Sequence, residues 1–195
     1  MSKARAELKA DSIRICASLA TALGSAVNEL QLREVVASDL ERFFKYQRDP
    51  EAARMAAFTA PDSDDRAAFD AHWRRILADP PVPIRTIEQD GAVAGYVLAY
   101  ESDGVPEVSY WIDRELWGQG IATHALNVFL SQFAHRPLRA RAATDNRGSI
   151  RVLEKCGFAI VGEERGYANA RGEEIAEYLF ELVSDQADTT TRLET

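Results

Sequence analysis

The spacing of apolar residues along this chain alternates between two periods, and each change of period predicts a new element. Alternating apolar and polar side chains predict strands, whereas apolar side chains at steps of three and four predict helices. A loop residue pair, Asp90-Gly91, favours a hairpin turn between the second and third strands. The segments with a strand period are Leu30–Val36, Ile84–Glu88, Val93–Tyr100, Val105–Ile112, Leu138–Thr144, Phe158–Tyr167 and Glu174–Val183.

Four helices are predicted between these strands. The first follows Ser38-Asp39 as its cap, and the second contains Phe69 and Trp73 and is ended by prolines at 80, 81 and 83. The third covers residues 121–133, where apolar side chains recur along one helical face. The fourth lies between Asn146, a good N-cap, and Gly157, which suits a left-handed C-terminal cap. The predicted order is β-α-α-β-β-β-α-β-α-β-β, with no internal repeat and no interdomain linker.

A glycine-rich turn joins the fourth strand to the third helix. Its sequence, Trp117-Gly-Gln-Gly-Ile-Ala122, places two glycines where the first backbone amides of the helix are exposed. Such amides and the helix dipole favour an anion, and a pyrophosphate is the ligand we expect. The turn matches neither the Walker pattern nor a full Gly-x-Gly-x-x-Gly. Taken alone, the pattern fits a phosphate cradle or a tight structural turn equally well.

Two motifs in this order resemble the GCN5-related N-acetyltransferases (GNAT). The acetyl-CoA motif of that family, Gln/Arg-x-x-Gly-x-Gly/Ala, corresponds to Trp117–Ala122, with Trp117 in place of Gln or Arg. Its second signature corresponds to Asn146 followed by Lys155-Cys-Gly-Phe158. The resemblance spans about residues 30–183. Within the family, the variant with Trp117 resembles the branch that contains the ribosomal-protein N-terminal acetyltransferases. The resemblance implies an α/β (α+β) fold with a mixed, mostly antiparallel sheet of six to seven strands flanked by helices. Strands 4 and 5 are expected to splay apart, with a bulge in the fourth.

The same resemblance implies where acetyl-CoA, the co-substrate, is bound. The backbone of the fourth strand is expected to meet the pantetheine arm and the thioester, and the amides of the glycine turn the pyrophosphate. Asn146 and Ser149 are expected beside the pantetheine and the thiol. The residues expected to bind the cofactor are Tyr110, Trp111, Ile112, Trp117, Gly118, Gln119, Gly120, Ile121, Ala122, Asn146 and Ser149.

The catalytic residues are less marked in the sequence. Glu107 starts the fourth strand, where many relatives place a general base, and an apolar cleft would raise the pKa of its carboxyl. The alternative reading is an exposed strand residue, and Asp113 and Glu164 are further candidates for the base. Many relatives carry a tyrosine seven residues after the Asn as proton donor, but this position is Leu153. Ser149 is therefore expected to hydrogen-bond the thiolate, or simply to cap its helix.

Further predictions complete the reading of the site. Tyr167 is a second possible proton donor. By resemblance, the loop Thr59–Asp65 and the last hairpin, Tyr167–Glu174, are expected to select the acceptor. Asp62, Asp64 and Asp65 in that loop would attract a cationic amine, although such loops are more often solvated.

Composition narrows the choice of partners. The 195 residues are 46% hydrophobic and carry a net charge of -8, which suits a compact enzyme domain and argues against nucleic acid as a partner. Cys16 and Cys156 are too few and too far apart for a disulfide framework or a metal site, and Cys156 is expected in the core rather than as a nucleophile. His72, His124 and His135 have no neighbouring metal ligands, so no metal is expected.

The two ends differ from the middle of the chain. Residues 1–29 contain an apolar stripe interrupted by Asp11 and Arg14, which favours an appended helix over a secretory signal. That helix would pack on the domain or on a second subunit, so a homodimer is one expectation. Residues 30–183 form the predicted acetyltransferase domain, and 184–195 are expected to be a disordered tail. No segment has the apolar length of a membrane span, and a cytoplasmic location is expected.

The sequence therefore predicts an acetyl-CoA-dependent N-acetyltransferase that moves the acetyl group directly to a primary amine. The acceptor would be a small molecule or a protein N-terminus. Another acyl-CoA donor is a second hypothesis. A non-catalytic CoA-binding sensor or interaction module of the same fold is a third, favoured by the missing tyrosine at Leu153.

Overall fold

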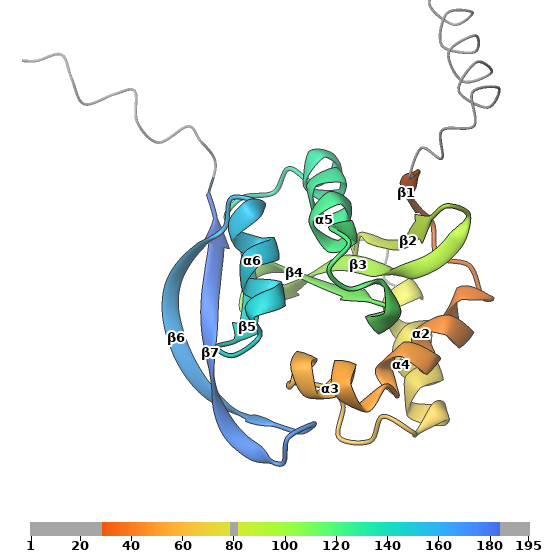
Figure 1. The fold of residues 1–195 in the computed structure, drawn as a ribbon, viewed down its shortest axis with the longest axis horizontal. Helices are drawn as coiled ribbons and strands as arrows, with labels where there is room; N and C mark the ends of the chain where they lie inside the picture. Colours follow the sequence, from red (N-terminus) through yellow and green to blue (C-terminus); the bar gives the residue numbers. More distant parts are fainter. Residues whose placement is uncertain (1–28, 79–81, 184–195) are drawn as a thin grey trace, which may run out of the picture.

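The computed structural model describes residues 29–78 and 82–183 as a single sheet with helices on both faces (Figure 1). Residues 1–28 of the predicted N-terminal segment 1–29 lie outside the described residues, as do the predicted tail 184–195 and the prolines at 80 and 81. In chain order the elements are β1 (Leu30–Arg33), α2 (Asp39–Gln47), α3 (Pro50–Ala56), α4 (Arg66–Ala78), β2 (Ile84–Gln89), β3 (Ala92–Ser102), β4 (Val105–Ile112), the 3-10 turn η1 (Arg114–Leu116), α5 (Ile121–Gln132), β5 (Leu138–Ala143), α6 (Arg147–Lys155), β6 (Ala159–Ala168) and β7 (Glu173–Leu182).

The sheet is mixed and mostly antiparallel, as predicted. Its strand order is β1-β2-β3-β4-β5-β7-β6, and only β4 and β5 run parallel. These two strands pair at one position, Glu107 with Arg139, and then separate, which confirms the expected splay. By contrast, all six residues of β5 pair with β7. The two halves of the sheet therefore meet at a single point and open from there.

The prediction of a bulge in the fourth strand was wrong for the side of β4 that pairs with β3. The register between β3 and β4 runs without a shift from Gly95 opposite Ile112 to Ser102 opposite Val105. The separation arises instead because β4 stays paired with β3 while β5 follows β7. The backbone of β4 is thus left free on one side without any local irregularity.

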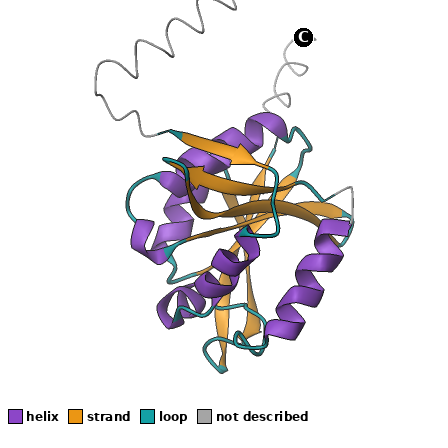
Figure 2. Ribbon diagram, turned by 90° about the vertical axis from the view of Figure 1, so that its right-hand side faces the viewer, coloured by secondary structure: helices purple, strands orange, loops and turns teal. Residues whose placement is uncertain are grey.

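Helices lie on both faces of the sheet (Figure 2), and each face carries its own apolar cluster. On one face, α5 and α6 pack on a core that includes Phe129, Leu138 and Phe180, all nearly inaccessible to solvent. On the other face, α2 and α4 contribute the aromatic side chains Phe43 and Trp73, whose ring centroids are 4.9 Å apart. The sheet is thereby fixed between two helical layers, and β4 lies within it.

The first third of the chain differs from the prediction in two details. A short helix, α3, begins at Pro50 after Asp49, whose side chain accepts hydrogen bonds from two amides of the first turn. Asp-Pro is an ordinary helix-start signal that the apolar pattern obscured. The predicted cap Ser38 makes no capping hydrogen bond among the described residues. The buried carboxylate of Asp39 accepts from the Val36 amide instead, and this ends β1 early.

No helix in the described part of the chain is long and apolar enough to cross a membrane. Within residues 29–78 and 82–183, no three His, Cys, Asp or Glu side chains are grouped so that they could hold a metal ion.

Candidate active site

The open side of β4 presents backbone groups of alternate residues. The amide of Asp113 donates to the Ala94 carbonyl (2.8 Å), so this amide faces β3. The carbonyl of Ile112 accepts instead from the Trp117 indole (3.0 Å), on the side away from β3. Because neighbouring residues of a strand point their backbone groups in opposite directions, the N–H groups of Tyr110 and Ile112 face the gap toward β5.

Trp111, the residue between them, has its backbone turned the other way. A Cβ atom placed on Gly95 would lie 1.9 Å from the Trp111 carbonyl oxygen, so this carbonyl points directly at β3. Glycine at this position permits the close approach of the two strands. Of the three predicted β4 contacts, the structure therefore exposes the backbone of two to the gap.

The glycine turn follows β4 directly. Gly118 and Gly120 have φ values of 76° and 81°, which favour glycine, and no described atom lies within 4 Å of the position that a Cβ would occupy on either. Trp117 is 41% exposed, and its indole bond to Ile112 ties the turn to the end of β4. The tryptophan that departs from the family motif thus has a local structural role.

The start of α5 leaves its backbone donors free of side-chain caps. Its N-cap is Gly120, which has no side chain, and Ile121, Ala122 and Thr123 supply no carboxylate to the first turn. The first intrahelical bond runs from the His124 amide to the Gly120 carbonyl (3.0 Å). The amides before it have no partner of that kind, and together with the helix dipole they form an anion site.

The start of α6 is built in the opposite way. The Asn146 side chain accepts from the Ser149 amide (3.0 Å) and donates to the Met55 carbonyl of α3 (3.0 Å). The prediction that Asn146 caps this helix is confirmed, as is the left-handed Gly157 after it, with φ at 90°. Both polar ends of the Asn146 side chain are therefore engaged within the protein.

Three side chains meet between β4 and α6. Ser149 and Cys156 are the polar neighbours of the Tyr110 hydroxyl. Cys156 is buried, as expected, and its thiol donates to the Thr123 carbonyl of α5 (3.7 Å). Burial raises the pKa of Cys156 to about 11, so the thiol stays protonated at neutral pH and is a poor nucleophile.

The predicted base, Glu107, lies in a charged cluster rather than at an apolar mouth. Its buried carboxylate accepts from the Tyr100 hydroxyl (2.6 Å) and pairs with Arg141 (3.2 Å). Arg141 also pairs with Glu164 (3.0 Å), a second candidate base, and with Glu177 (3.3 Å). Three carboxylates thus surround one guanidinium on the sheet face opposite α5 and α6.

Glu177 and Arg141 are the parts of this cluster that the sequence did not reveal. Glu177 is 7% exposed, and burial raises the pKa of its carboxyl above the ordinary value, against the opposing effect of Arg141. A proton acceptor with a raised pKa suits general-base chemistry. The only sequence signal was the alternation of polar residues in β5 and β7, which does not show that the two strands are neighbours.

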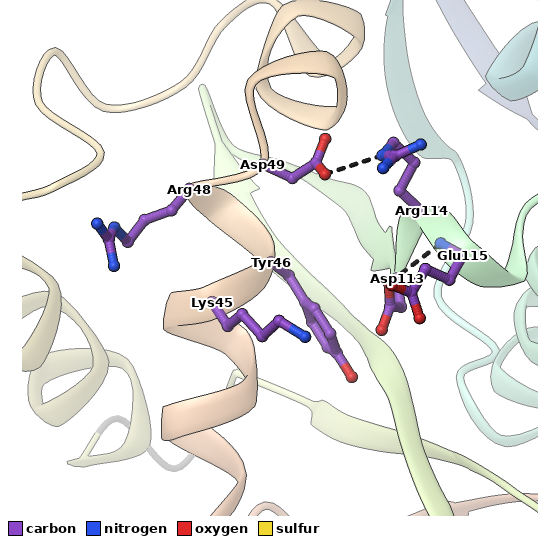
Figure 3. Close-up of a pocket in the computed structure, with 7 residues that line it drawn as sticks. All are labelled: Lys45, Tyr46, Arg48, Asp49, Asp113, Arg114 and Glu115. Carbon is purple, nitrogen blue, oxygen red and sulfur yellow. Dashed lines mark hydrogen bonds and ion pairs between the residues drawn. The ribbon is translucent and has the colours of Figure 1, made fainter.

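The other two alternatives lie elsewhere. Asp113 accepts from the Glu115 amide (3.1 Å) and lines a cavity of about 310 Å³ between α2 and η1 (Figure 3). An ion pair of 2.8 Å between Asp49 and Arg114 borders this cavity. Tyr167 is 60% exposed on β6. Among the described residues, the ion-pair partners of Arg141 are Glu107, Glu164 and Glu177, and neither Asp113 nor Tyr167 is one of them.

The two segments predicted to select the acceptor lie side by side. Asn169, in the β6–β7 turn, donates to the Thr59 carbonyl (2.8 Å), and the Ala170 amide donates to the Ala57 carbonyl (3.2 Å). Arg171 binds both oxygens of Asp145 at 2.8 Å. These bonds hold the loop after α3 against the last hairpin, near the start of α6.

Comparison with known proteins gives the family. A model described as "Acetyltransferase (GNAT) domain" matches residues 29–159. The "Uncharacterized N-acetyltransferase p20" of Bacillus licheniformis is 25% identical over 168 residues, which cover 79% of this chain and 92% of that protein. The "Putative ribosomal N-acetyltransferase YdaF" of Bacillus subtilis is 30% identical over 130 residues, covering 60% of this chain and 70% of the relative.

A solved structure agrees at the level of the fold. The spermidine N-acetyltransferase of Vibrio cholerae, solved with CoA and spermine, superposes with a TM-score of 0.69 at 17% identity. The match covers 79% of this chain and 95% of the other. With a family model that matches more than half of its residues, the chain belongs to the GNAT family of acetyltransferases.

Proposed function

We propose that this protein transfers the acetyl group of acetyl-CoA directly to a primary amine, on a small molecule or at a protein N-terminus. The observation that carries the proposal is the uncapped start of α5, which follows the open side of β4 after one turn. Free amides suit a pyrophosphate, and an open strand edge suits the amide groups of a pantetheine arm. The family of the chain and the names of its relatives support acetyl-CoA as the donor.

In this proposal the donor lies along β4. The amides of Gly118, Gln119, Gly120, Ile121 and Ala122 hold the pyrophosphate. The Trp117 amide, which was also predicted to do so, already donates to the Arg114 carbonyl (3.2 Å). The N–H groups of Tyr110 and Ile112 face the gap and are assigned to the pantetheine and the thioester carbonyl. A backbone donor near that carbonyl would stabilise the oxyanion that forms during transfer.

The transfer itself needs a neutral amine. Its nitrogen attacks the thioester carbon, the carbon–sulfur bond breaks with its electron pair on sulfur, and a base takes the proton that the amine loses. Glu107 is the proposed base. Arg141 forms an ion pair with Glu107 and another with Glu177, and so fixes the position of both carboxylates. Since Glu177 has the raised pKa, it is the residue to which the proton would pass if Glu107 remains paired.

The charge of the cluster supports a cationic acceptor. Glu107, Glu164 and Glu177 surround Arg141, so carboxylates outnumber the guanidinium three to one. An excess of negative charge at one site raises the concentration of cations near it. The bound spermine of the Vibrio cholerae structure is a ligand of that kind in that protein.

A two-step experiment tests the proposal. The protein is titrated with acetyl-CoA by calorimetry, and release of free thiol is then followed with polyamines, other small amines and N-terminal peptides. Binding together with amine-dependent thiol release is expected. Binding without release on any amine would favour the non-catalytic sensor, a role consistent with the ion pair that already engages Glu107. No binding would remove the basis of the proposal.

Glu107→Gln then tests the base. Turnover is expected to fall about 100-fold, because the glutamine cannot take the proton. Glu181→Gln is the matched control, since Glu181 faces Arg139 (3.5 Å) on the neighbouring strands. Equal turnover of Glu107→Gln and wild type across the pH range would show that Glu107 is not the base.

A further inference from the structure

Ser149 of α6 is close enough to the Tyr110 hydroxyl to lower its pKa, but no described group, Ser149 included, reaches hydrogen-bonding geometry with this hydroxyl. Among the residues that the structure describes, it is the only buried side-chain oxygen or nitrogen without a hydrogen bond. A buried polar group in this state is costly, and native proteins rarely retain one without a use. We therefore expect a group of a bound ligand to be the hydrogen-bond partner of this hydroxyl.

Its position lies on the path of the proposed donor. Tyr110 belongs to β4, and the backbone of this residue faces the gap toward β5. The hydroxyl has Ser149 of α6 and Cys156 as polar neighbours, and the Cys156 thiol in turn contacts the Thr123 carbonyl of α5. The Tyr110 oxygen thus lies near the first turn of α6. Cys156 connects this position to the first turn of α5, where the anion site is. Figure 1 shows α5 and α6 side by side on one face of the sheet.

We propose that the Tyr110 hydroxyl donates a hydrogen bond to the sulfur atom of CoA and stabilises the thiolate that leaves during acetyl transfer. This inference rests on the proposed function. When the carbon–sulfur bond breaks, the electron pair stays on sulfur. The phenol of Tyr110 donates a hydrogen bond to this sulfur but keeps its proton. The proton that ends on the thiol comes from solvent, while the amine proton passes to the base.

Two observations support a donor that keeps its proton. Burial raises the pKa of Tyr110 to about 12, so the phenol is protonated throughout the neutral range. Leu153, at the position where the resemblance implies a tyrosine, is buried in the core and has no hydroxyl. In this chain, β4 supplies a phenol where α6 does not.

The test measures the pKa of the thiol of bound CoA, from the ultraviolet absorbance of its thiolate, in wild type and in Tyr110→Phe. Loss of the hydrogen bond is expected to raise the thiol pKa by about one unit and to lower kcat by roughly 10- to 100-fold. The affinity for CoA should change less than about threefold, since the anion site is intact. This readout needs only CoA binding, so it works whether or not the acceptor is known.

The stability of the ligand-free protein gives a second readout. Removing an unpaired hydroxyl should leave the thermal midpoint unchanged or raise it by roughly 2–4 °C. Tyr46→Phe is the matched control, because the Tyr46 hydroxyl donates to the Val93 carbonyl (2.6 Å). This control should lower the midpoint and leave the thiol pKa of bound CoA as in wild type.

An unchanged thiol pKa in Tyr110→Phe that still binds CoA would overturn the inference and leave the proposed function standing. A midpoint that falls as far as in the Tyr46→Phe control would also overturn it, because the hydroxyl would then be paired within the protein. Failure of the wild type to bind CoA would overturn the proposed function and, with it, this inference.

Discussion

The helices α5 and α6 begin in similar settings, each after a strand of the central sheet and a short loop, yet their first turns are finished differently. Gly120 caps α5 with no side chain, and its amides are left open. Asn146 caps α6, binds the Ser149 amide and is tied to Met55. The first arrangement leaves donors for a ligand, whereas the second uses them to hold the fold together.

This difference separates binding from stability at two neighbouring sites. A glycine turn contributes little to folding, since its donors are completed only when an anion is present. An asparagine cap contributes to folding whether or not a ligand is bound. Substitutions at the two helix starts should therefore change different measured quantities.

The largest effect is expected for Gly120→Val. A branched side chain at a φ of 81° strains the turn and covers the amides, so the affinity for acetyl-CoA should fall at least about 100-fold. Gly104→Val is the matched control, because Gly104 has a φ of 76° and equally open surroundings in the β3–β4 turn. Calorimetry on both variants checks this, and equal affinities would remove the anion site from α5.

Asn146→Ala should act on stability instead. Loss of the cap and of the bond to Met55 is expected to lower the free energy of unfolding by about 2 kcal/mol. Asn146→Ser keeps a capping oxygen but loses the contact with α3, so an intermediate value is expected. Urea unfolding measures both. A larger loss of acetyl-CoA affinity than of stability would reverse the contrast between the two helices.

Thr123→Glu places a carboxylate in the open first turn of α5. The helix dipole should stabilise the ligand-free protein by about 0.5 kcal/mol, while repulsion of the pyrophosphate lowers the affinity for acetyl-CoA about tenfold. Ala68→Glu is the control at the start of α4, where the Ala68 amide is already bonded to Asp65 (2.8 Å). It should leave the affinity unchanged. Parallel changes in stability and affinity at Thr123 would contradict the account.

The smallest effect concerns Cys156, the residue that links the end of α6 to the first turn of α5. An unfolded thiol loses its proton above about pH 8.5, whereas burial raises the pKa of Cys156 to about 11. The folded state therefore holds the proton longer, and stability falls between these two values. This loss should be on the order of 1 kcal/mol at pH 10 and absent in Cys156→Ala. Thermal unfolding against pH measures it, and identical alkaline profiles would exclude this source.

The sequence predicted those features that depend on neighbouring residues. The strand period and the helical stripes predicted the order of the strands along the chain. Asn146 caps its helix as expected, because a cap depends only on the next three residues. The glycine turn was recognised for the same reason. The helix α3 was missed because it is too short to show a stripe, although Asp49-Pro50 marks its start.

Contacts between distant strands were not predictable in this way. Arg141 joins Glu107, Glu164 and Glu177 only because β5 lies between β4 and β7. No local pattern reveals that Glu107 meets an arginine 34 positions later. The Tyr110 hydroxyl likewise requires the packing of α6 on β4 before its missing partner becomes apparent.

The central claim, that the open start of α5 binds the pyrophosphate of CoA, is tested most directly by the backbone amide chemical shifts of the protein as CoA is added. The account predicts the largest shifts at Gly118, Gly120 and Ile121, with the Ala68 amide at the capped start of α4 unaffected. Saturating CoA that leaves the three α5 amides unmoved while other amides shift would contradict it.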